Sequence, residues 1–158
     1  MKSCLLINNL RIMKTLIFSL LTFIVLSCSK NEDKNNYVNN TITPVLIGKG
    51  THSGSATESN LVITNQIQWE QTMNLLTYQN TSTFTETNID FNYFQLLASI
   101  DTIRGDTGYS INISNVTENE NNITVTVTSE YSGTGFFVLS RPFQIVKIPR
   151  SNKPVVFQ

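Results

Sequence analysis

The chain has 158 residues, of which 40% are hydrophobic and 14% are charged, a length that suits one domain with a single core plus a short additional segment. Its 11 basic residues balance 11 acidic ones and are not concentrated, which argues against binding nucleic acid through the phosphates. Asn, Thr and Ser dominate the polar residues and favour turns and strands over long helices. The composition therefore predicts a β-rich protein.

The N-terminal segment is typical of an export signal. Met13-Lys14 gives a basic start, and residues 15–26 form a run too short for a membrane span of about 20 residues. Val25-Leu26-Ser27-Cys28 resembles the bacterial lipobox, whose cysteine receives diacylglycerol before cleavage. We predict a lipoprotein signal peptide at residues 1–27, with Met13 as an alternative start, and lipidation at Cys28. The resemblance implies a lipid-anchored cell-envelope protein of the outer membrane, on its periplasmic or surface face; an ordinary secretory peptide is the alternative.

Cysteine usage limits the chemistry of the mature chain. Cys4 and Cys28 are the only cysteines, and the first lies in the segment that cleavage would remove. No thiol would then serve a disulfide, a zinc site or a nucleophile, and we predict neither a metal site nor a cofactor. Cleavage would also leave eight basic residues against 11 acidic ones, a net charge of −3.

Residues 28–43 are predicted to form a disordered tether that carries the lipidated cysteine. Residues 30–36 mix charged and amide side chains with almost nothing to bury. This segment resembles the surface-export signal of Bacteroidetes lipoproteins, where a lysine followed by acids directs the protein to the outer face. A plain solvated linker is an equally open interpretation. The folded domain is predicted at residues 44–158.

Two apolar runs open the folded part, at residues 45–50 and 61–64, with a Gly-, Ser- and Thr-rich turn region at 51–60 between them. We predict the two strands of a hairpin. His52, the only histidine, lies in the turn region. A general base or metal ligand would need a partner, and no second histidine is present, so we interpret His52 as an incidental loop residue.

One helix is predicted to begin at Gln66 and to end at residue 76 or 77. The side chain of Asn65 can cap it by accepting a hydrogen bond from a free amide of the first turn. Trp69, Met73 and Leu76 follow the spacing of one helical face, which indicates a helix laid on a sheet. We interpret Trp69 as a core residue, with a ligand platform as the alternative.

A polar loop at residues 77–87 is followed by Phe94–Ile100, a nearly continuous apolar run that predicts a central strand covered on both faces. A polar turn comes next, in which Gly105 and Gly108 are predicted to supply positive φ angles. Asp106 and Thr107, between the glycines, are expected to bond the backbone of the turn.

The C-terminal half predicts more strands. Residues 109–114 and 123–128 alternate apolar and polar side chains and form the clearest hairpin. A second glycine-rich turn at 132–135 precedes a strand at 143–148, and residues 154–157 predict a short final strand. The fold class is therefore mainly β (α+β): an antiparallel sheet or sandwich with one short helix packed on it.

Five segments in order resemble the C-terminal domain of the PrcB family, a protease complex subunit family, and the likeness covers about residues 61–157. The segments are Gln68-Trp69-Glu70, Ile89-Asp90-Phe91, the apolar strand, residues 107–111 and residues 142–149. The family namesake is a lipoprotein that associates with a surface serine protease complex without being its peptidase. The resemblance implies a noncatalytic accessory module with a protein partner, such as a surface protease. The family often has two glycines before the tyrosine, whereas this chain has Thr107-Gly108.

Two loops are candidates for the contact surface, because exposed Tyr, Phe and Arg often anchor interfaces. The candidate residues are Asp106, Thr107, Gly108, Tyr109, Gly133, Gly135, Phe136, Phe137 and Arg141. The alternative is that the aromatic residues point into the core and the loops are connectors. Separately, Asp101-Thr102-Ile103 matches the Bacteroidetes O-glycosylation pattern, which makes Thr102 a candidate modification site.

A peptidase inhibitor and an envelope enzyme are two alternative functions. Residues 107–109, 133–135 and 141–143 resemble the ordered loop motifs of chagasin-type cysteine peptidase inhibitors. In that family whole strands separate the second and third motifs, so we expect that the three segments here cannot share the same end of a sandwich. An envelope enzyme would need positioned carboxylates or a histidine, and no nucleophile motif, phosphate loop or metal cluster is apparent. A cleft holding two of Asp90, Asp101 and Asp106 would favour that class.

Overall fold

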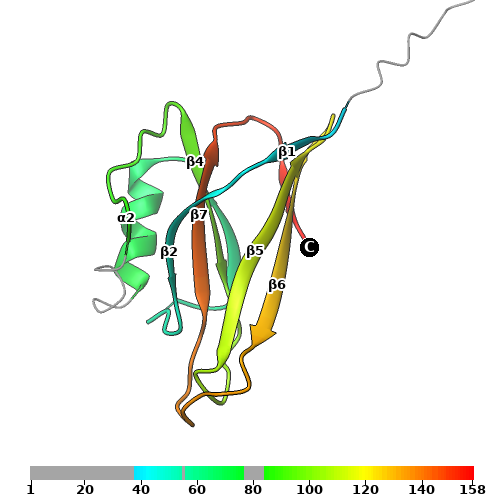
Figure 1. The fold of residues 1–158 in the computed structure, drawn as a ribbon. Helices are drawn as coiled ribbons and strands as arrows, with labels where there is room; N and C mark the ends of the chain where they lie inside the picture. Colours follow the sequence, from blue (N-terminus) through cyan, green and yellow to red (C-terminus); the bar gives the residue numbers. More distant parts are fainter. Residues whose placement is uncertain (1–37, 55, 77–83) are drawn as a thin grey trace, which may run out of the picture. The chain divides into compact units, whose positions relative to one another are not determined.

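The computed structural model describes residues 38–54, 56–76 and 84–158, which form a β-rich domain (Figure 1). The predicted signal peptide, Cys28 and the first part of the predicted tether lie outside the described residues. The elements are β1 (Asn40–Ile42), β2 (Val45–Gly50), β3 (Ser59–Ile63), α2 (Gln66–Leu75), β4 (Phe94–Ile100), β5 (Tyr109–Glu118), β6 (Ile123–Tyr131), β7 (Phe143–Pro149) and β8 (Val155–Phe157). The predicted fold class, mainly β with one short helix, is confirmed.

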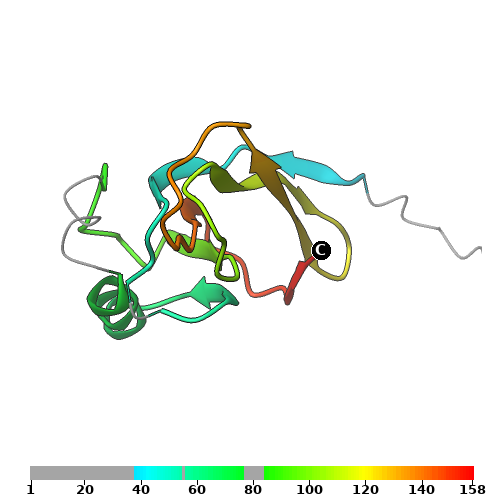
Figure 2. The ribbon, with the colours of Figure 1, turned by 90° about the horizontal axis from the view of Figure 1, so that it is seen from below.

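The strands form two four-stranded sheets, seen nearly end-on in Figure 2. The first sheet has the order β1-β5-β6-β8, and the second has the order β2-β7-β4-β3. Strand β8 runs parallel to β6, and the other pairings are antiparallel. One apolar cluster lies between the sheets, and another joins the second sheet to α2. The second sheet is therefore the middle layer of three.

Strand β4 lies inside the second sheet, between β7 and β3, and is buried on both faces. Leu96, Ala98 and Ile100 belong to the cluster shared with the helix, whereas Leu97 belongs to the cluster between the sheets. Successive side chains of a strand point to opposite faces, so a strand in the middle layer is buried at nearly every position; in β4 five of the seven residues are apolar, and Gln95 and Ser99 are buried polar ones. The prediction of a central strand covered on both faces is confirmed.

Helix α2 begins and packs as its sequence predicts. Asn65 caps it, with its Oδ1 atom 2.9 Å from the backbone nitrogen of Gln68. Trp69 is fully buried, its ring centroid lies 5.6 Å from that of Phe84, and its Nε1 atom donates a hydrogen bond to the Thr87 carbonyl oxygen at 2.9 Å. Trp69 is thus a core residue, which excludes the alternative of an exposed ligand platform.

The predicted hairpin of residues 45–50 with 61–64 is wrong in its pairing. Both strands form, as β2 and β3, but β2 pairs with β7 and β3 pairs with β4, at opposite edges of the second sheet. Strands β4 and β7 carry more buried positions than the edge strands and take the centre. A local apolar run predicts that a strand forms. Which strand it pairs with depends on which strands are most buried and therefore lie at the centre of the sheet.

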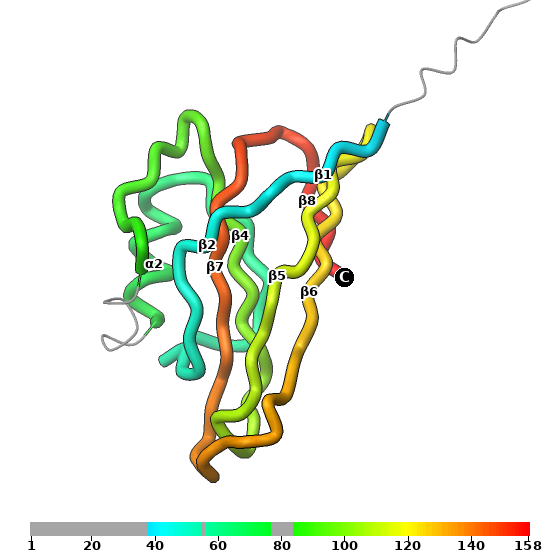
Figure 3. Tube along the Cα trace, in the orientation of Figure 1, coloured from blue at the N-terminus to red at the C-terminus, as the bar shows by residue number. Residues whose placement is uncertain are grey.

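The tether prediction is wrong for its last part, because Asn40–Ile42 forms strand β1. Ile42 pairs with Val116 of β5 and packs against the cluster between the sheets. The tube in Figure 3 shows β1 running beside the end of β5. Ile42 gives this segment an apolar anchor that residues 30–36 lack, and it moves the start of the folded domain toward the N-terminus.

The predicted hairpin of β5 with β6 is confirmed and is longer than the alternating pattern. Its register runs from Tyr109 opposite Tyr131 to Glu118 opposite Ile123, with a bulge between Ile113 and Asn115. The bulge accounts for the loss of alternation after residue 114, because an extra residue changes which face the next side chain points to. The predicted final strand is also present, as β8.

Replacement of Trp69 by Ala tests whether the helix layer carries stability. The change should lower the free energy of unfolding by about 3–5 kcal/mol, because it removes a fully buried ring and leaves a cavity. Ile67 lies on the same helix with 69% of its surface exposed, and Ile67→Ala should change the free energy by less than about 0.5 kcal/mol. Urea unfolding measures both; equal effects would show that Trp69 is not part of a packed core.

Candidate binding site at the loop end of the sandwich

Two connections far apart in the sequence meet at one end of the domain: residues 101–108, between β4 and β5, and residues 132–142, between β6 and β7. Arg104 and Ser140 join them through reciprocal backbone hydrogen bonds, with N···O distances of 2.8 and 3.0 Å. The Asp101 amide donates to the Pro142 carbonyl oxygen at 2.8 Å. These bonds continue the β4–β7 pairing beyond the sheet, which places the two predicted candidate loops side by side.

Asp106 and Thr107 hold the turn and dock it on the second loop. The Oδ1 atom of Asp106 accepts a hydrogen bond from the Gly108 amide at 2.7 Å, and the Ser140 hydroxyl donates to the Asp106 carbonyl oxygen. Thr107 forms two bonds with Phe136: its amide donates to the Phe136 carbonyl oxygen at 3.1 Å, and its hydroxyl oxygen accepts from the Phe136 amide at 3.0 Å. The expected bond to the turn backbone is present for Asp106, whereas the Thr107 side chain bonds the backbone of the second loop instead.

Gly108 and Gly135 allow the backbones of the two loops to approach each other closely. Gly105 and Gly108 lack the positive φ angles predicted for them; among the described glycines these occur at Gly54 and Gly133. A Cβ atom on Gly135 would lie 2.4 Å from the Gly108 nitrogen, and one on Gly108 would lie 2.9 Å from the Thr134 carbonyl oxygen. Asp106 closes the turn with ordinary angles, so the predicted positive φ angles are not required. Gly108 is needed for close packing against the second loop, whereas a Cβ atom on Gly105 would meet nothing within 4 Å.

Four side chains contact one another in series next to the turn: Asp101, Arg104, Tyr109 and Tyr131. Arg104 forms an ion pair with Asp101 at 2.9 Å, and this hydrogen-bonded contact raises the pKa of Arg104 further. The guanidinium carbon lies 4.9 Å from the centroid of the Tyr109 ring, which in turn lies 4.6 Å from that of Tyr131. The negative charge of Asp106 raises the pKa of Tyr131 above its ordinary value. Tyr109 is therefore half-buried in this series, neither a core residue nor a free contact residue.

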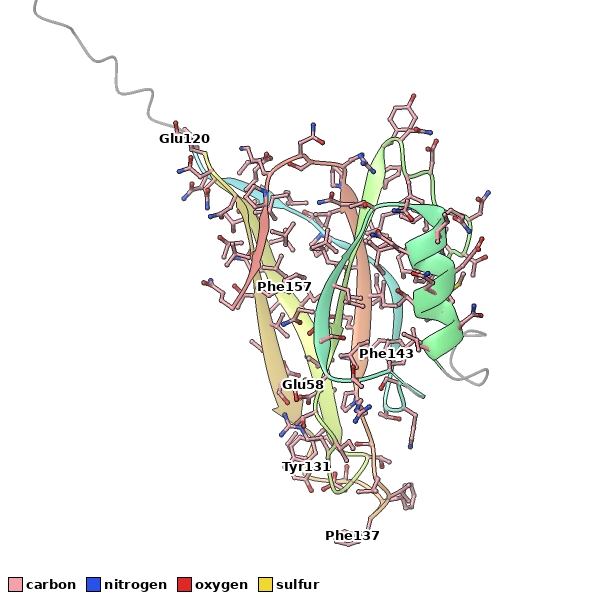
Figure 4. The ribbon with its side chains drawn as sticks, turned by 180° about the vertical axis from the view of Figure 1, so that it is seen from behind. Glu58, Glu120, Tyr131, Phe137, Phe143 and Phe157 are labelled. Atoms are coloured by element: carbon pink, nitrogen blue, oxygen red, sulfur yellow. The ribbon has the colours of Figure 1, made fainter. Side chains whose placement is uncertain are left out.

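Beyond the docked turn lies a group of exposed apolar side chains, which we call the apolar tip: Ile103, Phe136, Phe137, Val138 and Leu139. The exposed fractions of Phe136 and Phe137 are 80% and 96%, and those of the other three are between 54% and 69%. Phe137 lies at the extreme end of the domain in Figure 4, beyond Tyr131. The alternative that Phe136 and Phe137 point into the core is excluded.

The remaining candidates lie elsewhere. Gly133 belongs to the exposed turn, whereas Arg141 points away from the tip toward the connection after β2, where its Nη1 atom donates to the Ala56 carbonyl oxygen. Thr102 is half-buried, and its amide donates to Asp101 at 2.8 Å.

Three residues of the tip, Ile103, Val138 and Leu139, were missed as site residues. A run of four apolar residues directly after a glycine-rich turn was the available signal.

Arg141 lines a cavity of about 260 Å³ together with residues 52–54, Ile103, Leu139 and Ser140. Two of its polar atoms, Ser53 Oγ and Arg141 Nε, are shielded from solvent without a hydrogen-bond partner in the described part of the chain. An unsatisfied buried polar group costs about 1–3 kcal/mol. His52 forms part of the cavity wall, and its Nδ1 atom lies 2.9 Å from the Thr51 hydroxyl oxygen.

Of the three carboxylates named for an enzyme, Asp90 lies at one end of β4, and Asp101 and Asp106 lie beyond the other end. Asp90 accepts a hydrogen bond from the Asn92 amide at the start of β4, whereas Asp101 and Asp106 bond Arg104 and Gly108 beyond its other end. Within residues 38–54, 56–76 and 84–158, no three His, Cys, Asp or Glu side chains are grouped as a metal site. In the same ranges no helix combines the length and apolar character needed to cross a bilayer.

The three segments that resemble chagasin-type motifs do share one end of the sandwich, so the expectation that they could not is wrong. Thr107 bonds Phe136, which directly follows the 133–135 segment, and Arg104 bonds Ser140, which precedes the 141–143 segment. Few residues separate the second and third segments, but both lie on the connection into β7, beside the turn at 106–108.

Comparisons of the chain with protein-family models, with curated proteins and with solved structures find no match in any of the three.

Substitution of the glycines tests whether the two loops are one rigid unit. Gly135→Ala should lower the free energy of unfolding by about 1–3 kcal/mol and shift the amide resonances of residues 106–108, because the new methyl group would overlap the Gly108 backbone. Gly105→Ala is the control: nothing lies within 4 Å of its Cβ position, so Ala there should be neutral or stabilise the fold by about 0.4–1 kcal/mol. Two variants with unperturbed loop resonances would contradict the docking.

Proposed function

We propose that the chain is a noncatalytic lipoprotein of the cell envelope that binds a protein partner through the apolar tip. It would be anchored through Cys28, at the outer membrane, and would act as an accessory module of a larger complex. The resemblance to the PrcB family supports this proposal and suggests a surface protease as the partner. The contact residues proposed from the sequence, apart from Arg141, lie in the two loops that carry the tip or hold it in place.

The observation that carries the proposal is the exposure of consecutive apolar side chains on a hydrogen-bonded support. Contiguous exposed apolar patches commonly mark interaction sites on soluble domains, and Phe side chains are enriched in the cores of interfaces. The support is ordered by the bonds of Thr107 to Phe136 and of Arg104 to Ser140. A surface that is ordered before binding loses less conformational entropy on association.

The tip also lies far from the point where the chain enters the domain. Strand β1 pairs with the Val116 to Glu118 end of β5, whereas the turn that holds the tip precedes Tyr109 at the other end. Ten residues of β-strand span about 30 Å. A chain anchored at Cys28 would thus enter the domain at the end opposite the tip.

Site-specific photo-crosslinking tests the proposal in the protein's native envelope. A photoreactive residue at Phe137 should give a discrete adduct with one envelope protein, because this side chain is 96% exposed at the centre of the tip. The same residue at Glu120, in the exposed turn at the other end of the domain, is the matched control and should give no such adduct (Figure 4).

A second variant separates binding from folding. Phe136→Ser with Leu139→Ser should abolish the adduct formed from position 137, while the free energy of unfolding changes by less than about 1 kcal/mol because neither side chain belongs to a core cluster. Adducts of equal yield from positions 137 and 120, or an adduct insensitive to the double substitution, would contradict the proposal.

A peptidase inhibitor is the second candidate, favoured by the three chagasin-like segments lying at one end of the sandwich. A protruding apolar loop on a rigid support could enter a peptidase cleft. The purified protein should then inhibit papain-like or subtilisin-like enzymes at micromolar concentration, and Phe137→Ser should weaken inhibition by at least about tenfold. No inhibition of either class at micromolar protein would remove this candidate and leave the accessory-module proposal intact.

A further inference from the structure

The cavity beside the apolar tip combines an unpaired cation with apolar walls. Ile103 and Leu139, both more than half exposed, form its apolar wall, and Arg141 and Ser53 lie on the side toward the connection after β2. Among the described residues, no carboxylate lines the cavity and no salt bridge includes Arg141. The guanidinium of Arg141 is therefore a cation at the cavity without a described acidic partner.

Arg141 is held in place by hydrogen bonds, but one of its polar atoms and one of Ser53 lack a hydrogen-bond partner among the described residues. The Arg141 backbone amide donates to the Thr51 carbonyl oxygen at 2.8 Å, and its Nη1 atom donates to Ala56. Within the part of the chain that the structure describes, its Nε–H group has no acceptor, and the hydroxyl of Ser53, a residue with 0% exposure, has no partner either. A guanidinium N–H and a hydroxyl that belong to residues of one cavity, and that have no described partner, are complementary to a group that offers two acceptor oxygens.

We propose that this cavity binds a carboxylate of the partner protein, presented next to an apolar side chain. The carboxylate pairs with the Arg141 guanidinium and the Ser53 hydroxyl, and the apolar side chain packs on Leu139 and Ile103. Both polar atoms are shielded from water in the free protein, so binding includes a small side-chain rotation that turns them to the ligand. This inference rests on the proposed function and adds the chemistry that the partner must offer.

The size of the cavity agrees with this occupant. Pockets for whole small-molecule ligands measure roughly 300–1,000 Å³. A cavity of about 260 Å³ lies just below that range and suits one side chain or a chain terminus. Arg holds carboxylates through its planar set of N–H groups, which fixes orientation as well as charge.

The test uses a small carboxylate as the probe. 4-Phenylbutyrate and its neutral amide are titrated into the purified ¹⁵N-labelled protein, and the amide resonances are followed. The acid should shift the resonances of residues 52–54 and 139–141 with millimolar affinity, and the neutral amide should bind at least about tenfold more weakly because it lacks the charge.

Two substitutions assign the contacts. Ser53→Ala should weaken binding of the acid about tenfold, while the unfolding free energy stays the same or rises because an unsatisfied buried hydroxyl is removed. A purely structural role for Ser53 would not give these opposite effects. Arg141→Gln should abolish the preference for the acid over the amide. Ser114→Ala, at an exposed position of β5, is the control and should leave binding unchanged.

Equal binding of acid and amide, tighter binding of inorganic phosphate than of the acid, or shifts confined to other parts of the domain would each overturn the inference. Its failure is distinguishable from that of the proposed function. If Ser53→Ala leaves the crosslinked adduct from position 137 unchanged while the Phe136→Ser, Leu139→Ser variant abolishes it, the tip binds the partner and the carboxylate assignment is wrong.

Discussion

The pairing of β4 with β7 is the interaction on which the rest of the domain depends. The seven-residue ladder runs from Phe94 opposite Pro149 to Ile100 opposite Phe143, and its two faces contribute to both apolar clusters. The same pairing continues past the sheet as the bonds of Asp101 to Pro142 and of Arg104 to Ser140. The loops at the tip are thus an extension of the most buried part of the fold, which gives an exposed surface a rigid base.

Polar and apolar residues have separate tasks at this end of the domain. The turn is closed by Asp106, Thr107 and Ser140 through hydrogen bonds to backbone atoms, so no apolar side chain is required to stabilise it. Phe136 and Phe137 are therefore left outside, where they add little to folding and keep their apolar surface exposed. The stability determinants lie in the helix and sheet layers, around residues such as Trp69.

Local patterns predicted the elements well, because strand and helix periodicity is a property of neighbouring residues. The helix cap at Asn65, the β5–β6 hairpin and the buried strand β4 follow from such patterns. The edge positions of β2 and β3 and the addition of β1 did not follow, since they depend on which strands are covered on both faces. The outward orientation of Phe136 likewise depends on Thr107, 29 residues away in the chain.

The three residues before Pro142 show how one short segment can serve both the tip and the cavity. Ser140 is buried, with its amide and hydroxyl bonded to Arg104 and Asp106, whereas Leu139 is 69% exposed. All three residues line the cavity: Leu139 contributes apolar surface that also belongs to the tip, and Arg141 extends toward the connection after β2. A partner that covers Leu139 would therefore also cover the cavity that Arg141 lines. In the proposed complex, apolar contact at Leu139 and charge recognition at Arg141 would come from one short segment at the entry to β7.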